Sequence, residues 1–167
     1  MIQNFFRTSF FVALLVLSAS FSSAAESYGY FAKSAQLVSF NESAHFAMHS
    51  VMKFPQALYV AHYLDSAKIS IDSKVRVVKE ELMQNTWSPM LKELGDTAMV
   101  SYAELLQWSL VQSDNNASDL LFKFCGTPQN ITRYIEKLGF KNIQVGATDA
   151  EMHADLAKSD LNWCTPK

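Results

Sequence analysis

The sequence predicts an α+β fold in which a helical body, roughly residues 50–140, carries only a few short strands. Three observations lead to this prediction. An almost uninterrupted apolar segment runs from Ser50 to Leu64, helix-start signals recur after it, and strand-like patterns are confined to short stretches. Because so few short strands cannot cover both sides of a core, we expect the sheet to be incomplete.

Residues 1–25 are expected to be an export signal and not part of the fold. Arg7 supplies a sparse positive charge, residues 10–21 a short apolar core, and residues 22–25 the small side chains of a cleavage site. The apolar run is too short to span a bilayer, and the cleavage point has no Cys to carry a lipid. We therefore expect a secreted, periplasmic protein without a membrane anchor, with one domain over residues 26–167.

That domain is expected to begin with short strands and to continue into a central helix. Two strands are predicted within residues 28–41, around a turn near Lys33. The segment from Ser50 to about Leu64 is apolar almost all round, which predicts a helix buried on all sides. Pro55 is compatible with this helix because it lies near the first turn.

The remaining helices are predicted from their capping signals. They are expected to run from Ser88-Pro89 to Gly95, from the Ser101/Glu104 pair to about Val111, over residues 116–124 before Gly126, and from Thr127-Pro128 to Gly139. Strands are expected within residues 74–83 and 141–145, and the remainder of the chain to Lys167 is expected to be irregular.

Composition narrows the classes of partner. The 167 residues carry a formal net charge of -2 with interspersed signs, which argues against nucleic acid or an anionic membrane as partner. Cys125 and Cys164 are compatible with a disulfide in an oxidising compartment or with two unpaired thiols. Their spacing matches no metal site, so we expect no metal. We also expect no cofactor, and a monomer if the chain folds.

Ser50 and Lys53 form the first candidate catalytic motif. At positions i and i+3 of one helix, the hydroxyl and the amine are within side-chain contact. A lysine withdrawn from water is easily kept uncharged and can accept the serine proton. The alternative is a helix N-cap serine followed by a lysine that extends to solvent.

Ser113, Asp114 and Asn115 form the second candidate motif. They lie between two predicted helices, where an Asx-rich turn would also be ordinary. With Ser50 and Lys53 upstream, they supply a second hydroxyl and a carboxamide. The two motifs together predict a serine acyl-transfer site that needs no His-Asp pair.

On these motifs and the phrases around them, the chain from about residue 36 to 166 resembles class A serine β-lactamases, and most closely their extended-spectrum, cephalosporinase-like subgroup. The fold that this implies is β-lactamase/transpeptidase-like, mostly the helical domain plus the first sheet strands. The matching phrases are residues 45–54, 82–89, 105–109, 112–121, 150–155 and 162–163.

The resemblance implies a role for each matching residue. Ser50 would be the acylated nucleophile and Lys53 its proton acceptor. Ser113 would pass a proton to the β-lactam nitrogen, and Asn115 would bind the acylamide side chain of this small-molecule substrate. Trp87 would be the aromatic residue at the cleft mouth; the alternative is a Trp flanking the core.

Residues 147–167 would correspond to the family's Ω-loop, whose Glu activates the deacylating water. Asp149 stands at that position, and its carboxylate would lie roughly 1.5 Å further back, a displacement that can lower the rate about a hundredfold. Glu151 could substitute if the loop shifts. His153 would help to place the water. The alternatives are two solvated loop acids and a surface histidine.

Two departures from the family pattern affect the expected activity. No Lys-Thr-Gly or Lys-Ser-Gly follows Ser113, and few residues separate the export signal from the first strand. The sequence therefore predicts a C-terminally truncated β-lactam hydrolase with impaired turnover. The alternatives are a non-catalytic relic or a weak penicillin-binding fragment. A penicillin-binding peptidase is disfavoured by the acidic segment 149–153.

Overall fold

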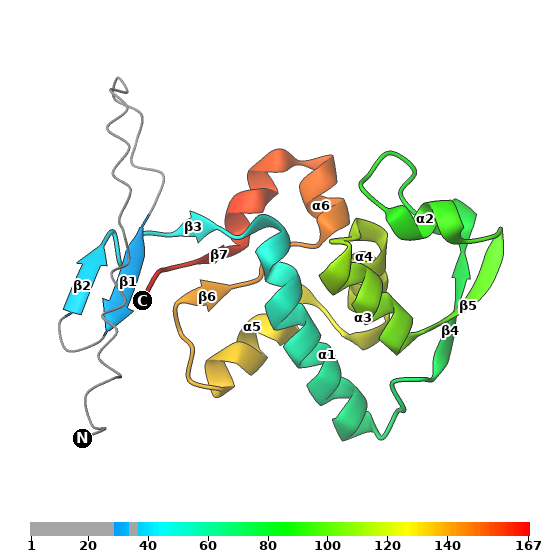
Figure 1. Cartoon of the computed structure of the whole chain (residues 1–167), viewed down its shortest axis with the longest axis horizontal. Coiled ribbons are helices and arrows are strands. Elements are labelled where there is room, and N and C mark those ends of the chain that lie inside the picture. Colours follow the sequence, from blue (N-terminus) through cyan, green and yellow to red (C-terminus); the bar gives the residue numbers. More distant parts are fainter. Residues whose placement is uncertain (1–28, 34–36) are drawn as a thin grey trace, which may run out of the picture.

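A computed structural model of the chain describes residues 29–33 and 37–167. The expected export signal and part of the first turn lie outside these residues. The described chain forms a helical body with a small two-stranded sheet at each end (Figure 1). The α+β class expected from the sequence is confirmed, with small antiparallel sheets beside the helices.

The central helix is α1 (Lys53–Ala67), preceded without a break by a 3-10 turn, η1 (His49–Met52). It ends at Lys68, whose φ of 56° is left-handed. The prediction that this segment is buried on all sides is wrong. Phe54 is 62% exposed and Val51 65% exposed, so one face of the helix is open to solvent.

The other predicted helices are present close to their expected bounds. Ser101 Oγ accepts from the Glu104 backbone N–H at 3.1 Å, and the Glu104 carboxylate accepts from the Ser101 N–H at 2.7 Å, which is the expected capping box. The capping residues in the sequence therefore predicted the start of this helix correctly. The helices are α2 (Pro89–Glu93), α3 (Tyr102–Val111), α4 (Asn115–Cys125) and α5 (Pro128–Lys137).

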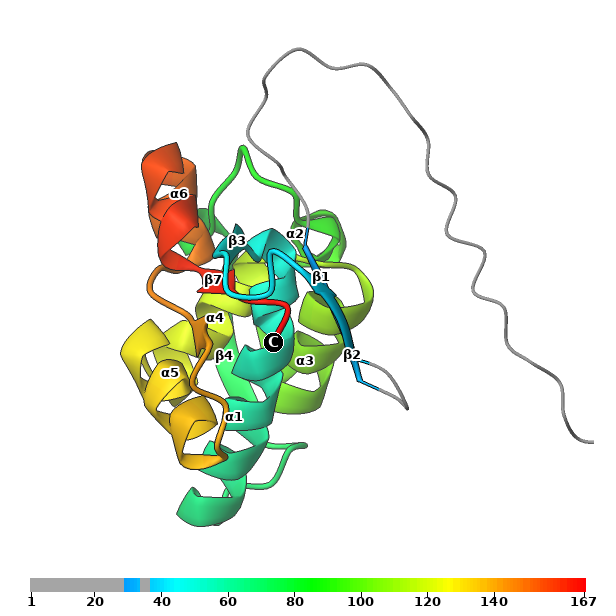
Figure 2. The same ribbon diagram turned by 90° about the vertical axis from the view of Figure 1, so that its left-hand side faces the viewer.

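α1 packs between α3 and α4 on one side and α5 on the other (Figure 2). Its buried residues therefore contribute to two apolar cores. Val60 and Leu64 join the core with α3, α4 and the sheet of β4 and β5, and Met52, the N-cap of α1, joins the core with α5. Burial on both sides fixes the N-terminal end of α1, where the candidate nucleophile lies.

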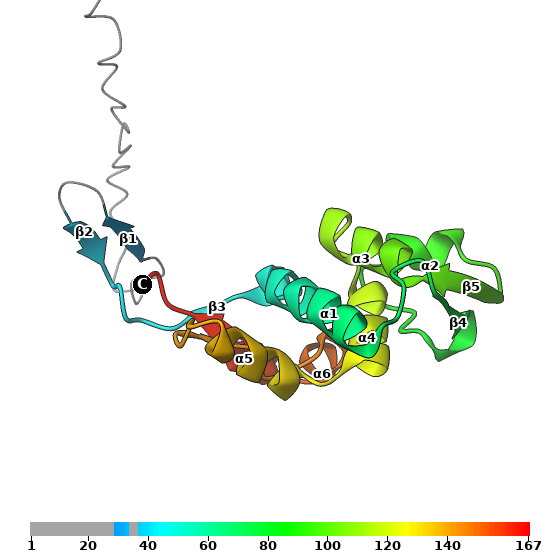
Figure 3. The ribbon, with the colours of Figure 1, turned by 90° about the horizontal axis from the view of Figure 1, so that it is seen from below.

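Within the described residues the strands are short and form three separate antiparallel sheets. The β1–β2 hairpin stands apart from the helices at one end of the molecule (Figure 3). The two-stranded sheet of β4 and β5 at the other end pairs Lys74 with Ser101, with η2 and α2 in the connection between its strands. Strands β5, β3 and β7 were not predicted. The bounds are β1 (Tyr30–Lys33), β2 (Leu37–Phe40), β3 (Phe46–Ala47), β4 (Lys74–Val78), β5 (Thr97–Ser101), β6 (Ile143–Gln144) and β7 (Trp163–Cys164).

The expectation that the chain after residue 145 is irregular is wrong. It contains α6 (Asp149–Ala154), a 3-10 segment η3 (Leu156–Leu161) and β7, which lies between β3 and β6. Trp163 on β7 stacks on His45 with ring centroids 3.5 Å apart. The segment is therefore held back against the chain that leads into η1. Another short 3-10 turn, η2 (Lys79–Glu81), follows β4.

Both cysteines are free thiols. Cys125 is buried in the core with α3 and α4, whereas Cys164 packs against the core with α5. The disulfide that the sequence left open is therefore absent from this structure. Over the described ranges, 29–33 and 37–167, no helix is long and apolar enough to cross a membrane.

Candidate active site

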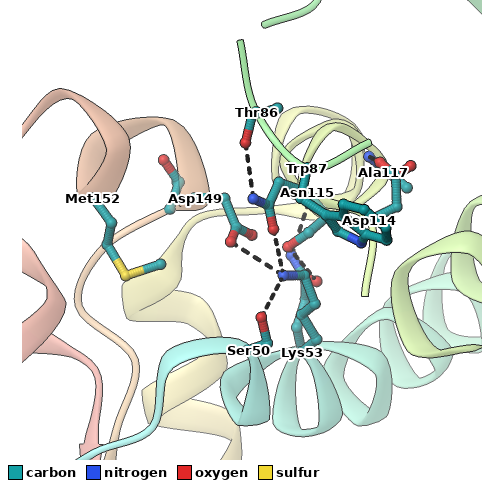
Figure 4. Close-up of polar contacts among 12 residues, drawn as sticks. Ser50, Lys53, Thr86, Trp87, Asp114, Asn115, Ala117, Asp149 and Met152 are labelled. Atoms are coloured by element: carbon teal, nitrogen blue, oxygen red, sulfur yellow. Dashed lines mark hydrogen bonds and ion pairs between the residues drawn. The ribbon is translucent and has the colours of Figure 1, made fainter. Parts of the chain in front are cut away.

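The ammonium group of Lys53 is the centre of the candidate site. It donates hydrogen bonds to Ser50 Oγ at 3.2 Å, to Asn115 Oδ1 at 2.8 Å and to Asp149 Oδ1 at 3.1 Å (Figure 4). A lysine ammonium has three donors, so all three are used. The contacts join η1, α4 and α6, which are far apart in the sequence.

Lys53 is the first residue of α1 and is only 2% exposed, while Ser50 precedes it in η1 and is exposed. Lys53 therefore does not extend to solvent, and the alternative interpretation of this motif is wrong. The N-cap of α1 is Met52 and not Ser50. His49 has a left-handed φ of 46° immediately before Ser50. Such conformations of non-glycine residues are costly and are concentrated at functional sites.

The Ser113–Asn115 segment lies against the same centre. Ser113 is half-buried and also has a left-handed φ, 55°. The Asn115 backbone N–H donates to the Trp87 carbonyl at 3.0 Å, and its side-chain Nδ2 donates to Thr86 Oγ1 at 2.8 Å. Because Thr86 takes the amide nitrogen, the amide oxygen of Asn115 is turned toward Lys53. Thr86 was not identified from the sequence.

Asp114 has a structural position that sequence reasoning missed. It is fully buried and accepts hydrogen bonds from Ser88 Oγ at 2.9 Å, from the Met90 N–H at 2.7 Å and from the Ala117 N–H at 2.9 Å. It thus caps α4 and ties the start of α2 to it. Because Asp114 lies between Ser113 and Asn115, its hydrogen bonds hold the backbone of this loop in place.

Asp149, and not Glu151, faces Lys53. Asp149 is 7% exposed, so it is not a solvated loop acid. Burial raises the pKa of its carboxyl, and the charge of Lys53 opposes that rise. Glu151 is exposed and accepts from the Thr148 N–H at 2.9 Å as part of a capping box. Its carboxylate is therefore occupied in starting α6.

Trp87 and His153 are both exposed. The Trp87 ring is 60% exposed and its Nε1 donates to the Gln112 carbonyl at 2.8 Å, which excludes a Trp that flanks the core. In Figure 4 the ring lies beside Asn115. His153 is exposed on α6, one turn after Asp149.

Asn162 holds the segment before α6 in place, and its role was also missed. It is fully buried, and its side-chain Oδ1 accepts from the Gly146 N–H at 2.7 Å and from the Ala147 N–H at 2.9 Å. Its backbone carbonyl accepts from the Met48 N–H at 2.8 Å. Asn162 therefore links the approach to Asp149 with the approach to Ser50.

A serine hydroxyl, a carboxamide and a carboxylate thus contact the ammonium of one buried lysine, which is the arrangement that a serine acyl-transfer site would require. The chain matches a family model over residues 15–167, and it belongs to the beta-lactamase enzyme family.

Relatives and solved structures support this family membership. The chain is 40% identical over 123 residues to extended-spectrum beta-lactamase PER-1 of Pseudomonas aeruginosa, covering 73% of this chain and 40% of that protein. It is 32% identical to beta-lactamase VEB-1 of the same organism, covering 75% of this chain and 42% of VEB-1. The crystal structure of TLA-3 extended-spectrum beta-lactamase superposes with a TM-score of 0.75 at 36% identity, over 82% of this chain and 50% of that one. The chain thus spans less than half the length of the two sequence relatives.

Proposed function

We propose that this chain carries the acylation centre of a serine β-lactam hydrolase. The Ser50 oxygen would attack the lactam carbonyl carbon while its proton passes to Lys53. For this, Lys53 must first be a neutral amine. The Asp149 carboxylate lies 3.1 Å from the Lys53 nitrogen and could take that proton. Transfer within a buried pair leaves no uncompensated charge behind.

The substrate would be oriented by the loop that faces Ser50. As the carbonyl carbon bonds to the Ser50 oxygen, the ring C–N bond breaks and the nitrogen needs a proton, which Ser113 would deliver and recover from Lys53. Asp149 would then return its proton to Lys53. Asn115 would bind the acylamide group of the substrate through its amide, and the exposed ring of Trp87 would form the wall at the entrance.

Release of the product would require water. Asp149, ionised again, would accept a proton from a water molecule that attacks the acyl carbon, with His153 helping to place the water. This proton would pass to the Ser50 oxygen as its bond to the acyl carbon breaks. The N-terminal sequence around Arg7 and the small residues 22–25 support export, so we infer that the reaction would take place outside the cytoplasm.

The observation that carries this proposal is the three-way bonding of Lys53 to Ser50, Asn115 and Asp149. Incubation of the purified chain with a fluorescent penicillin tests it. We expect covalent labelling that Ser50→Ala abolishes and that Ser66→Ala, an exposed serine later on α1, leaves unchanged. Labelling that persists in Ser50→Ala would contradict the proposal.

A second candidate function is penicillin binding with little release. It is favoured by the burial of Asp149 Oδ2, which has no hydrogen-bond partner in the described part of the chain and does not reach solvent. An attacking water would have to enter this position. Mass spectrometry of the labelled protein over time separates the two candidates, because a hydrolase loses the added mass and a binding protein keeps it.

A further inference from the structure

Asp119 is a buried carboxyl that the proposed reaction does not use. It lies on α4, one turn after Asn115, and α4 packs against α6. Neither of its carboxylate oxygens reaches solvent or has a partner within hydrogen-bond geometry among residues 29–33 and 37–167. The backbone N–H groups of Asp149 and Ala150 face it, although they do not meet full hydrogen-bond geometry.

Two buried carboxyls therefore lie near one buried ammonium, and only Asp149 is in contact with it. Lys53 contacts Asp149 Oδ1, whereas Asp149 Oδ2 and both oxygens of Asp119 are buried without a bond of full hydrogen-bond geometry among the described residues. The nearest donors are the Ser118 side chain for Asp149 and the two N–H groups named above for Asp119. Ionisation of both carboxyls would leave one negative charge buried without a counter-ion, which is strongly unfavourable. A single proton on the pair removes that charge and supplies a donor.

The direct contact with Lys53 decides which carboxyl is ionised. Asp149 has the ammonium at 3.1 Å, so the proton belongs on Asp119. Burial, and then the charge of Asp149, raise the pKa of Asp119 to about 7, although the backbone N–H groups of Asp149 and Ala150, and after them the charge of Lys53, oppose this rise. Buried Asp114 adds negative charge near Asp149.

The charges on the far side of Asp119 do not replace the missing counter-ion. A cavity of about 160 Å³ beside Asp119 is lined by Arg76, Glu81 and Lys123. Lys123 is more than half exposed and is paired with Glu81 at 3.2 Å. Arg76 is exposed on β4. These groups are solvated or already paired, so Lys53 remains the counter-ion of the buried carboxyls Asp119 and Asp149.

We propose that Asp119 is a positioning residue for Asp149: held as a neutral acid beside the first turn of α6, it leaves Asp149 as the carboxylate that pairs with the Lys53 ammonium. Ionisation of Asp119 would place a second negative charge beside Asp149 and oppose the ion pair that fixes it. The role of Asp149 in this inference rests on the proposed function. The protonation of Asp119 does not, and it can be measured without any activity.

The test is carboxyl NMR of the full chain with 13C-labelled aspartate between pH 4 and 9. We expect one aspartate to titrate near pH 7 in the wild type and in the exposed control variant Asp160→Asn, and this signal to be lost in Asp119→Asn. In Asp149→Asn the same signal should move down by about one pH unit or more, because the neighbouring charge is gone.

A near-neutral signal that survives in Asp119→Asn, or that does not move in Asp149→Asn, would overturn the proposal. If Asp119→Asn does not fold, the wild type and Asp149→Asn still decide the outcome. A failure of penicillin labelling would count against the proposed function alone. If labelling occurs, release of the acyl group should slow from pH 6 to pH 8 in the wild type, with a flatter profile in Asp119→Asn.

Discussion

Lys53 and Asp149 form a buried ion pair, 3.1 Å between nitrogen and oxygen, with 2% and 7% of their side chains exposed. It closes the segment that contains α6 onto the start of α1. In the same chain, Lys68 and Asp65 form a pair at 3.6 Å that is more than 80% exposed at both residues. The two pairs have the same chemistry, but their contributions to stability should differ strongly.

Replacement of Lys53 by methionine should destabilise the fold by about 3–5 kcal/mol at pH 8, because it leaves the Asp149 charge buried and unpaired. At pH 5 the loss should be smaller, since Asp149 can then take up a proton. Urea unfolding at both pH values measures this. The control Lys68→Gln should lose no more than about 0.5 kcal/mol, and an equal loss in both variants would contradict the expectation.

Asp114→Ala should be destabilising by about 2–4 kcal/mol, because it removes the N-cap of α4 and leaves the Ser88 hydroxyl and the Met90 N–H buried without their acceptor. Asp114→Asn keeps one acceptor oxygen and should lose less. Thermal unfolding followed by circular dichroism compares the two. Equal losses in the two variants would show that hydrogen-bond acceptance is not what Asp114 provides.

Asp149→Glu tests the length of the acid directly. The extra methylene would bring the carboxylate roughly 1.5 Å closer to an attacking water, and release of the acyl group should rise about tenfold to a hundredfold. Asp149→Asn should instead retain the label. The rate of label loss from the fluorescent acyl-enzyme is the measurement, and faster release in Asp149→Asn than in the wild type would refute this role.

Asp119 should make the stability of the wild type fall as pH rises. Its pKa is raised from 3.8 to about 7 in the folded protein, so between these values the folded state binds more protons than the unfolded state. This contribution is complete below about pH 4 and lost above about pH 7. Relative to Asp119→Asn, the wild type should lose up to roughly 4 kcal/mol over this range.

The free energy of unfolding at pH 4.5 and at pH 8 gives this difference for each protein. Asp160→Asn, at an exposed position, is the matched control and should follow the wild type. Parallel profiles for the wild type and Asp119→Asn would contradict the assignment of the proton.

The two thiols should react at very different rates. Burial raises the pKa of Cys125 to about 11, and the side chain is 3% exposed, whereas Cys164 is half-buried and lines an open groove. Ellman's reagent should find one accessible thiol in the native protein and two after unfolding in urea without reductant. Fewer than two in urea would indicate a disulfide.

Local signals in the sequence predicted the helices well. The Ser101/Glu104 capping box and the Thr127-Pro128 start fix their helices through hydrogen bonds within one turn, which a sequence shows directly. The same kind of signal, Thr148 with Glu151, starts α6 and could have been used. The two-residue strand β7 has no such signal, because it forms only by pairing with β3 and β6.

In the candidate site, too, the sequence predicted contacts within one helical turn but not contacts between distant parts of the chain. The i, i+3 spacing predicted the contact between Ser50 and Lys53, since both belong to one helical turn. Asn162 and Thr86 could not be found in this way. Their functions depend on hydrogen bonds to residues 15 or more positions away in the chain, which only the folded backbone brings together.

The open face of α1 bears on the thermodynamics of the whole chain. Phe54 and Leu58 line an apolar groove of about 800 Å³ together with Phe140 beyond the end of α5, and all three remain exposed in the folded state. Apolar surface that is in contact with water in both the folded and the unfolded state adds nothing to the heat capacity increment of unfolding. Calorimetry should therefore give an increment below the usual value of about 12–15 cal/mol/K per residue, and the temperature dependence of the unfolding enthalpy should be correspondingly shallow.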